Sequence, residues 1–465
     1  MAEKPMTRTE TLIDDIRRRI VTGALAPGER LASVRRYAAM MTVSPSTVVE
    51  AYDRLAAEGL IRARRGSGFY VSGIPLVTRS LADTSNTRRR EVDPFWVSRQ
   101  SLDASADELT PGCGWLPADW MPDEALRKGL RQLTRSPDTL LTDYGSSRGS
   151  IVLRRLLLAR FAQEGLSASM EQLMLTGSGS QALDLLCRFL LRPGDSVVVD
   201  DPCYFNFQAL LRAHQVNIVG VPFTPTGPDI AVFEQVLATV HPRLYITNSA
   251  LHNPTGACLS AQTAYRVLSA AAANDTLIIE DDIFADFEPD PSPRLAIPDG
   301  LDRVIRTGSF SKTLSASVRC GYIACRAEWI EGLTDLQIAT NFGGPSPLSS
   351  ELIASVLAGG SYRKHLAEVI TRLDRARKEA TERLSALGII PWMVPRGGFY
   401  LWCRLPEGID SALIAQRCRE EGVVLAPGNV FSVSQSAAAY LRFNVAHLNA
   451  RVYRVLQQAI AEQQS

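Results

Sequence analysis

Apolar positions recur at helical spacing in the first part of the chain. Within residues 11–22, TLIDDIRRRIVT, four apolar side chains share one stripe: Leu12, Ile13, Ile16 and Ile20. This pattern predicts an amphipathic helix. Ser33 is placed to cap a short second helix, and Ser44 followed by Pro45 marks the start of a third.

The third helix has an inner stripe of its own, formed by Val48, Ala51, Tyr52 and Leu55. Two short strands follow, LIRAR and FYVSG, on either side of a turn with two glycines, which predicts a hairpin. Residues 1–73 hold 12 basic and 8 acidic side chains, so this end of the chain is mildly positive. Three helices, a tight turn and a basic hairpin predict a winged helix-turn-helix domain over residues 1–73.

The pattern changes twice after the hairpin. Residues 74–108 lose periodicity and mix Ser, Asp and Thr with a run of three arginines, which predicts a linker. From residue 109 to 465, short apolar runs such as SVVVDD and LIIEDD alternate with helical stretches. This alternation predicts an α/β domain with a largely parallel sheet. Helical and strand stretches after Pro345 predict a smaller terminal subdomain.

Composition excludes several classes of protein. The 465 residues are 46% hydrophobic and 21% charged, with a net charge of +1, so the chain is globular and its total charge names no partner. No run of 18 apolar residues is present, which argues against a membrane span. Eight scattered cysteines without zinc spacing predict buried thiols, no metal site and a reducing cytoplasm.

Five motifs lie where predicted strands of the large domain end. In chain order they are TGSGSQALDLL (176–186), DPCY (201–204), HNPTG (252–256), IIEDDIFADF (278–287) and GSFSKTLSASVRCGY (308–322). Each motif alone is weak, because a Gly/Ser turn is common, an aromatic residue is more often core and a lone lysine is usually solvated. Their occurrence together in this order, over about 150 residues, is strong evidence for a shared function.

Pyridoxal phosphate (PLP) is the cofactor whose chemistry needs these parts together. Lys312 supplies the amine for a Schiff base, Asp281 keeps the pyridine nitrogen protonated, and Asn253 donates to the ring oxygen. Tyr204 is placed to stack on the flat ring. The phosphate needs a helix N-terminus, hydroxyls and a cation, and five residues are expected to supply them: Ser178, Gly179, Ser180, Ser309 and Arg319.

The first domain resembles the DNA-binding domain of GntR-type transcription regulators, over LASVRRYAAMMTVSPSTVVEAYDRLAAEGLIRARRGSGFYV. The resemblance implies binding to a double-stranded DNA operator, with the third helix in the major groove. The residues it places toward DNA are Arg35, Ser44, Ser46 and Thr47, with Arg64, Arg65 and Gly66 on the wing. Many relatives carry arginine at the positions of Pro45 and Val49, so Arg35 is the best candidate to read a base. A solvated helix face remains the alternative for each arginine alone.

Residues 109–465 resemble fold-type I, class I/II aminotransferases, and RGGFYLW (396–402) and LRFNVAH (441–447) belong to the same pattern. The resemblance implies that Arg442 grips a substrate carboxylate and that Tyr144 reaches the cofactor phosphate of a partner subunit. The two parts together resemble the MocR/GabR subfamily of bacterial regulators. Such proteins are head-to-tail homodimers whose PLP domain senses a ligand, so a small amino compound or PLP itself is the expected effector.

The chain departs from the family at one position that matters for catalysis. Relatives often have tyrosine where this chain has Phe284 or, in another register, Ile283, so a second donor to the ring oxygen is missing. The leading hypothesis is therefore a PLP-dependent, DNA-binding transcription regulator. The alternatives are a working aminotransferase with an accessory DNA-binding module, and a repressor whose PLP is only structural. Intact Lys312, Asp281 and Arg442 favour retained amine chemistry over the last.

Overall fold

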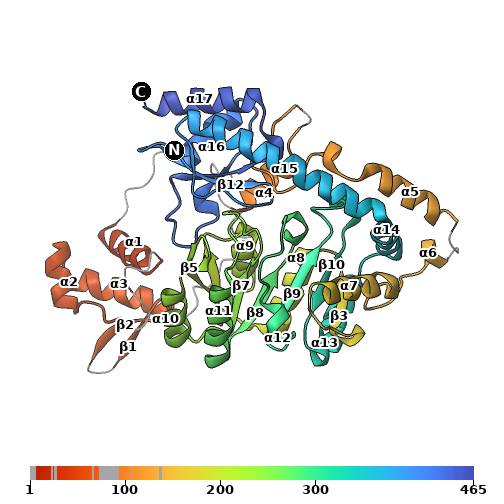
Figure 1. Cartoon of the computed structure of the whole chain (residues 1–465). Coiled ribbons are helices and arrows are strands. Elements are labelled where there is room, and N and C mark those ends of the chain that lie inside the picture. Colours follow the sequence, from red (N-terminus) through yellow and green to blue (C-terminus); the bar gives the residue numbers. More distant parts are fainter. Residues whose placement is uncertain are drawn as a thin grey trace. The chain divides into compact units, whose positions relative to one another are not determined.

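The computed structural model describes residues 7–21, 25, 29–64, 67–72, 94–105, 107–135 and 139–464. The chain divides into two compact units, Met1–Arg88 and Arg89–Ser465 (Figure 1). Each unit has a hydrophobic core of its own, which confirms that the DNA-binding and cofactor-binding patterns belong to separate folding units.

The N-terminal unit contains three helices and a hairpin. Its elements are α1 (Arg8–Val21), α2 (Val34–Met41), α3 (Pro45–Ala57), β1 (Ile61–Arg64) and β2 (Gly68–Val71). The strands pair antiparallel, with Ile61 opposite Val71 and Arg64 opposite Gly68. Ser33 Oγ accepts a hydrogen bond from the Arg36 amide, and Ser44 Oγ accepts one from the Thr47 amide, so both predicted N-caps are confirmed.

The predicted stripes form the core of this unit. Leu12, Ile13 and Ile16 of α1 pack with the whole inner stripe of α3 (Val48, Ala51, Tyr52 and Leu55), and all of these side chains are buried. The Tyr52 hydroxyl donates to the Ala32 carbonyl at 2.8 Å, which satisfies the polar end of a buried ring. The solvent-facing side of α3 therefore takes no part in the core.

The C-terminal unit is built on an eight-stranded sheet. Its strands are β3 (Leu173–Thr176), β4 (Ser196–Asp201), β5 (Asn217–Thr224), β6 (Gly227–Pro228), β7 (Leu244–Thr247), β8 (Leu277–Asp281), β9 (Val304–Ser309) and β10 (Gly321–Ala324), in the spatial order β3-β10-β9-β8-β7-β4-β5-β6. The strands from β9 to β5 pair in parallel, whereas β10 is antiparallel to both β3 and β9. Consequently β3, β4, β7, β8 and β9 all end at the same edge of the sheet.

Helices cover both faces of this sheet. They are α5 (Asp123–Leu133), α6 (Thr139–Thr142), α7 (Ile151–Gln163), α8 (Gly179–Leu190), α9 (Phe205–Ala213), α10 (Ile230–Val240), α11 (Ala261–Ala273), α12 (Ala296–Asp299), α13 (Ala327–Asn341) and α14 (Pro347–Ala358). Successive strand residues alternate between faces: Val198 shares a core with α7, α10, α11 and α14, and Val197 and Val199 share one with α8, α9 and α13. The sheet is therefore the middle layer of an α/β sandwich.

A smaller lobe ends the chain, as predicted. It contains α15 (Gly360–Ala386), α16 (Ser411–Glu420), α17 (Ala450–Gln464) and an antiparallel sheet of β11 (Ile390–Pro391), β12 (Tyr400–Arg404), β13 (Ala426–Pro427) and β14 (Tyr440–Asn444) in the order β11-β12-β14-β13. Figure 1 shows these elements gathered together in blue, apart from the green strands of the large sheet.

The structure differs from the sequence prediction over the second half of the expected linker. Residues 94–102 form a helix, α4 (Pro94–Leu102), which packs against α9. Val97 is buried with Phe205, Trp402 and Phe431. The amide of Leu109 also donates to the Gly422 carbonyl at 2.9 Å. Residues 94–108 thus belong to the C-terminal unit. The preceding residues, 74–93, lie outside the described ranges.

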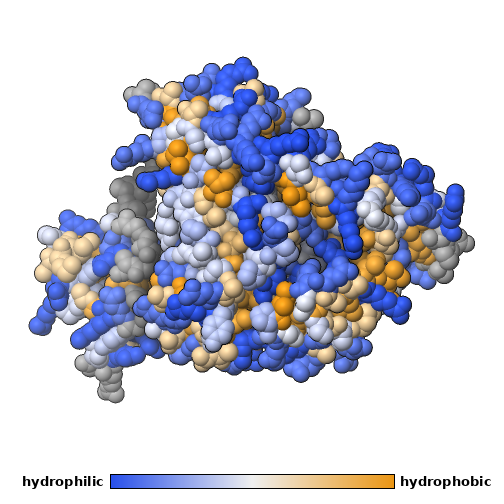
Figure 2. Space-filling model, viewed as in Figure 1, coloured by the Kyte–Doolittle hydropathy of each residue, from blue (hydrophilic) through white to orange (hydrophobic). Residues whose placement is uncertain are grey.

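Two further predictions concern the cysteines and membrane-spanning segments. All eight cysteines are unpaired; seven are buried and Cys258 is partly buried, as predicted. None of the helices in the described ranges is both long enough and apolar enough to cross a membrane. Figure 2 shows polar side chains over most of the visible face, with apolar side chains in separate patches.

Candidate functional site

One cavity of the C-terminal unit collects the predicted cofactor and substrate residues. Its volume is about 250 Å³. Every residue of that prediction except Tyr144 lines it: Ser178, Gly179, Ser180, Tyr204, Asn253, Asp281, Ser309, Lys312, Arg319 and Arg442. Most of these follow the carboxyl ends of β3, β4, β7, β8 and β9, where parallel sheets bind ligands. The five motifs meet because these strands end at one edge.

The N-terminus of α8 forms an anion cradle. Ser178 caps the helix, its Oγ accepting from the Gln181 amide at 3.0 Å, so the free amides of the first turn face the cavity. Gly321 lies directly beneath, where an added Cβ would stand 2.7 Å from the Gly179 nitrogen. Ser309 Oγ and Ser311 Oγ, 2.9 Å apart, add hydroxyls. With Arg319 on the same wall, the groups that a phosphate needs are present.

Both Lys312 and Asp281 line this cavity; Asp281 is buried and Lys312 is partly buried. Burial lowers the pKa of Lys312 to about 8, and the nearby Arg442 charge acts in the same direction. A fraction of the amine is therefore neutral, and nucleophilic, near neutral pH. Burial raises the pKa of Asp281 to about 7, with the Asp282 charge adding to the rise. A buried cation beside Asp281, such as a protonated ring nitrogen, would lower this pKa again and restore the carboxylate.

Arg442 is almost fully buried and holds Asn253 in a defined orientation. Its guanidinium donates to Asn253 Oδ1 at 2.8 Å and to the Gly112 carbonyl at 2.6 Å. Since Oδ1 accepts from the arginine, the amide nitrogen of Asn253 is left to donate, as a ring-oxygen partner requires. Arg442 Nε is buried and has no hydrogen-bond partner among the described residues. Arg442 lines the cavity, and a cationic guanidinium with an unsatisfied donor suits an anionic ligand such as a carboxylate.

Aromatic rings enclose the rest of the cavity. Tyr204 lines it, as predicted, with its ring centroid 5.0 Å from that of Phe205. Both Ile283 and Phe284 line the cavity, so neither register supplies the donor that a tyrosine would give. The Phe284 ring packs edge-on against Tyr400, with centroids 5.4 Å apart. The departure from the family pattern therefore lies at the cofactor site itself.

Tyr144 is the one predicted residue outside the cavity. Its side chain is 77% exposed and its ring packs edge-on against Phe342, with centroids 4.9 Å apart. An exposed tyrosine cannot serve the cavity of its own chain, but its exposure leaves it available to another subunit. Its predicted role in a partner's site stays a prediction.

Several cavity residues escaped the sequence prediction: Val97, Ser101, Leu102, Gly112, Gly114, Trp115, Ser311 and Tyr400. Tyr400 lies in the RGGFYLW motif, but a tyrosine in a strand resembles ordinary core. An added Cβ at Gly114 would stand 3.2 Å from the Tyr400 hydroxyl and 3.7 Å from Lys312 Nζ, so both groups lie around this glycine. The apolar run at the start of α4 was the available signal for Val97.

The N-terminal unit presents a second candidate site, on the outer face of α2 and α3. Ser44 and Ser46 are exposed at the start of α3, and Ser44 Oγ lies 2.8 Å from both Ser46 Oγ and Thr47 Oγ1. Arg35 is exposed on α2. These hydroxyls and this cation suit a DNA backbone or base edge. Arg64, also exposed, packs over the Tyr70 ring at 4.6 Å, whereas Arg65 and Gly66 lie outside the described residues.

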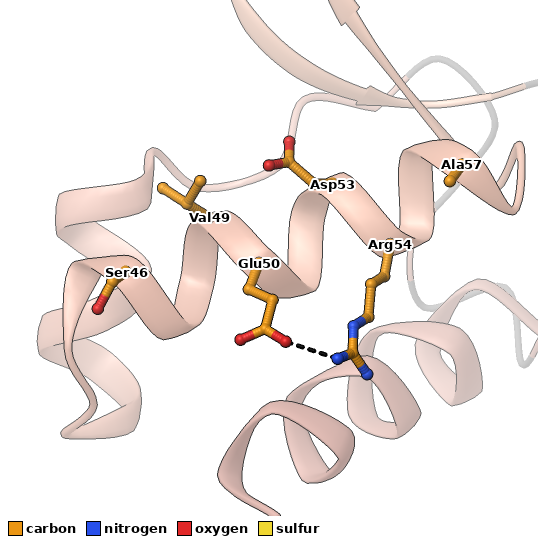
Figure 3. A pocket seen from close by; sticks show the side chains of 6 residues that line it. All are labelled: Ser46, Val49, Glu50, Asp53, Arg54 and Ala57. Atoms are coloured by element: carbon orange, nitrogen blue, oxygen red, sulfur yellow. Dashed lines mark hydrogen bonds and ion pairs between the residues drawn. The ribbon is translucent and has the colours of Figure 1, made fainter.

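The exposed face of α3 changes character along the helix. A shallow depression on it is lined by Ser46, Val49, Glu50, Asp53, Arg54 and Ala57 (Figure 3). Glu50 forms an ion pair with Arg54 at 2.6 Å, drawn as the dashed line, and Asp53 adds a second carboxylate to the same face. The first turn is thus neutral and polar, and the later turns carry carboxylates that repel phosphate. Contact with DNA is best suited to the first turn.

Comparisons with known proteins match both units of the chain. Residues 118–460 match the family model "Aminotransferase class I and II", and residues 8–71 match "Bacterial regulatory proteins, gntR family". The uncharacterized HTH-type transcriptional regulator YdcR of Escherichia coli is 27% identical over 453 residues, which is 95% of each chain. The HTH-type transcriptional regulator NorG of Staphylococcus aureus is 26% identical over 443 residues, 91% of this chain and 98% of the relative.

Among solved structures, the α-aminoadipate aminotransferase LysN of Thermus thermophilus shares the fold. Its TM-score is 0.72 at 24% identity, over 79% of this chain and 95% of LysN. The predicted fold, an α/β aminotransferase domain behind a helix-turn-helix domain, is confirmed. The chain belongs to the aminotransferase class I and II family, with an N-terminal domain of the gntR family of bacterial regulatory proteins.

Proposed function

We propose that this protein is a transcription regulator that binds operator DNA through its N-terminal unit and senses an amino compound through PLP held in its C-terminal unit. The observation that carries the proposal is that Lys312, Asp281, Asn253 and Arg442 line one cavity, on a chain whose other unit is a gntR-type domain. YdcR and NorG, both named HTH-type transcriptional regulators, match along nearly the whole chain, which supports regulation. Action on operator DNA implies a cytoplasmic location.

The cavity fits PLP group by group. The α8 N-terminus, Ser309, Ser311 and Arg319 would hold the phosphate, and Asn253 would donate to the ring oxygen. The Asp281 carboxylate would hold a proton on the ring nitrogen. PLP supplies an electrophilic carbon that reversibly bonds amines and an electron sink. Lys312, with a pKa of about 8, provides the neutral amine that PLP requires.

Arg442 would bind the carboxylate of the effector. Its Nε is the orphaned donor, and its other nitrogens are already anchored by Asn253 and Gly112. Lys312 would hold PLP, which would supply the carbon for which an effector amine competes, and Lys312 Nζ would also be placed in the cavity to act as a base. Residues that line the cavity would make contacts with the effector that are lacking when the effector is absent. This difference in contacts can shift the affinity of the protein for DNA.

A homodimer is part of the proposal. Three large side chains are each more than 60% exposed: Leu141, Tyr144 and Phe342. They lie in two segments of the chain, and the rings of Tyr144 and Phe342 pack against each other. Apolar residues gathered at a surface support an interface with a second copy. A head-to-tail arrangement would carry Tyr144 toward the partner's phosphate, as the family resemblance implies.

A working aminotransferase is the second candidate. The retained Lys312, Asp281, Asn253 and Arg442 favour it. The absence of a donor at both Ile283 and Phe284 argues for slow turnover, because the ring oxygen loses an electrostatic partner during proton transfer.

The test is spectral and uses the full chain. Purified protein loaded with PLP should absorb in the visible, and borohydride should fix the cofactor on Lys312. Lys312→Ala should abolish this fixation, whereas the control Lys364→Ala, at an exposed lysine, should retain it. Gel shifts with DNA from upstream of the protein's own gene should change when PLP or an amine is added. Fixation that persists in Lys312→Ala, or DNA binding that ignores all ligands, contradicts the proposal.

A further inference from the structure

Val49 is a large apolar side chain that stands exposed on α3. The other large apolar side chains of this helix, Val48, Tyr52 and Leu55, are fully buried, whereas Val49 is 44% exposed. Val49 also lies outside the hydrophobic core of the N-terminal unit. Its methyl groups are therefore available to a partner, and an apolar contact with that partner would remove them from water.

The position of Val49 on the helix is that of a residue that meets bases. It follows the first turn of α3 directly, and it lines one depression together with Ser46, three residues earlier on the same side of the helix. Its side chain points away from the Glu50–Arg54 ion pair, so this pair does not cover it (Figure 3). In helix-turn-helix domains, the N-terminal part of the second helix of the motif enters the major groove and contacts base edges. In this protein that helix is α3.

The side chains that precede Val49 allow α3 to come close to the bases. Valine is short, so it touches a base only if the helix backbone lies deep in the groove. Residues 44–47 are Ser, Pro, Ser and Thr, which are all small and uncharged. Their hydroxyls are drawn together, since Ser44 Oγ lies 2.8 Å from both Ser46 Oγ and Thr47 Oγ1. The start of α3 is therefore compact enough for a close approach.

The chemistry of a valine side chain selects one base. Valine neither donates nor accepts a hydrogen bond, and thymine is the base that presents an apolar group, its C5 methyl, in the major groove. We propose that Val49 reads a thymine of the operator through contact with this methyl group. The inference rests on the proposed function, because it assumes that α3 binds operator DNA, and it adds a base preference and the residue that sets it.

The experiment removes one methyl group from the DNA and leaves every hydrogen-bonding group in place. Full-length protein loaded with PLP first selects duplexes from a random library. Each thymine of the selected sequence is then replaced by uracil, which lacks only the C5 methyl. At the thymine that Val49 contacts, the replacement should raise the Kd measured by gel shift about 4-fold, as expected for one buried methyl-sized group.

A variant of the protein assigns the contact to Val49. Val49→Ala should bind the thymine duplex about 4-fold less tightly than wild type does, and the uracil replacement should then cost it little, because the two changes remove the same contact. Leu413→Ala, at an exposed leucine of the C-terminal unit, is the matched control and should show the full uracil effect. Alanine is a strong helix former, so Val49→Ala should fold as wild type does.

The outcomes separate this inference from the proposed function. If the wild-type protein selects a sequence in which no thymine responds to loss of its methyl, the role of Val49 is overturned and DNA binding stands; this result needs no variant. A uracil effect of the same size in Val49→Ala also overturns the role of Val49, because another side chain then reads the methyl. A protein that binds no DNA, with or without PLP, overturns the proposed function and this inference with it.

Discussion

The two candidate sites of this protein keep their functional groups in opposite surroundings. In the C-terminal unit, Asp281, Asn253 and Arg442 are buried, and their contacts are specified to single atoms. In the N-terminal unit, Arg35, Ser44 and Ser46 stand exposed on helices whose other faces form the core. Burial makes a polar group costly unless it is paired, whereas exposure makes it nearly free.

The difference determines how much each site reveals about its ligand. Inside the cavity, an unpaired atom such as Arg442 Nε indicates what is missing, since a buried donor requires an acceptor. On α3, the exposed Ser46 hydroxyl pairs with Ser44 Oγ and indicates no ligand by itself, because water can satisfy its remaining hydrogen-bonding capacity. The chemistry of the buried ligand is therefore better defined than the sequence of the DNA.

The largest effect expected is at the orphaned donor. Arg442→Gln removes a charge-assisted contact with the effector carboxylate, and half-saturation by leucine should rise by about 100-fold. The measurement is the absorption titration of the PLP-loaded protein. Arg404→Gln, at an exposed arginine that ends β12, is the control and should bind as wild type does. Equal losses in both variants would show that Arg442 supports only the fold.

The next effect concerns stability of the cofactor-free protein. The folded-state pKa of Asp281, about 7, lies above its ordinary value, so this carboxyl stabilises the folded state at low pH and loses that contribution as pH rises through 7. Asp281→Asn should therefore raise the free energy of unfolding at pH 8 by about 2–3 kcal/mol, and by little near pH 4.

Urea unfolding at the two pH values measures this, with Asp335→Asn, an exposed site, as the control. The same Asp281→Asn variant should hold PLP less tightly, because the ring nitrogen loses its carboxylate partner. A variant less stable than wild type at pH 8 would mean that the carboxylate is satisfied without a cofactor.

On the exposed side, Arg35→Ala tests whether any side chain reads a base. If Arg35 contacts a guanine, the loss should be about 1–3 kcal/mol on operator DNA and smaller on random DNA. Gel shifts over a range of salt concentrations measure both, and Arg192→Ala in the other unit is the control. Equal losses on the two DNAs would make Arg35 a phosphate contact, and the salt dependence would then fall as well.

The smallest effect expected is at Phe284. Phe284→Tyr would place a hydroxyl where the family usually has one, and a donor to the ring oxygen draws electron density from it. The pKa of the lysine-linked cofactor, read from the visible band, should fall by about half a unit. Tyr265→Phe, at a tyrosine that is 72% exposed and outside the cavity lining, serves as the control. An unchanged or raised pKa would show that residue 284 does not influence the cofactor.

Sequence reasoning brought its candidate cofactor residues together because each motif is local. Asp281 ends one buried strand and Ser178 comes two residues after another, so the end of a strand was enough to place them at one sheet edge. The N-cap role of Ser44 could also be predicted, because the amide that it caps belongs to Thr47, only three residues further along the chain. In these places the short-range pattern and the fold agree.

The α4 helix was missed for the opposite reason. Its burial depends on Phe205, Trp402 and Phe431, which lie 100 to more than 300 residues further along the chain. No pattern within residues 94–102 predicts contact with those distant residues, and a segment of mixed polar residues is typical of a linker. Tyr400 was missed in a similar way, since alternation along a strand does not distinguish a residue facing core from one facing a cavity.

The anchoring of Arg442 has a thermodynamic consequence. One guanidinium holds Asn253 Oδ1 at 2.8 Å and, under the proposed function, would also bind the effector carboxylate, so binding of the cofactor ring and binding of the effector would share a single side chain. Two ligands that depend on one group have a coupling free energy. By reciprocity, the factor by which the effector tightens or loosens PLP equals the factor by which PLP tightens or loosens the effector. The cell's supply of the vitamin-derived cofactor would then set the sensitivity of the switch, even where the amino acid concentration is constant.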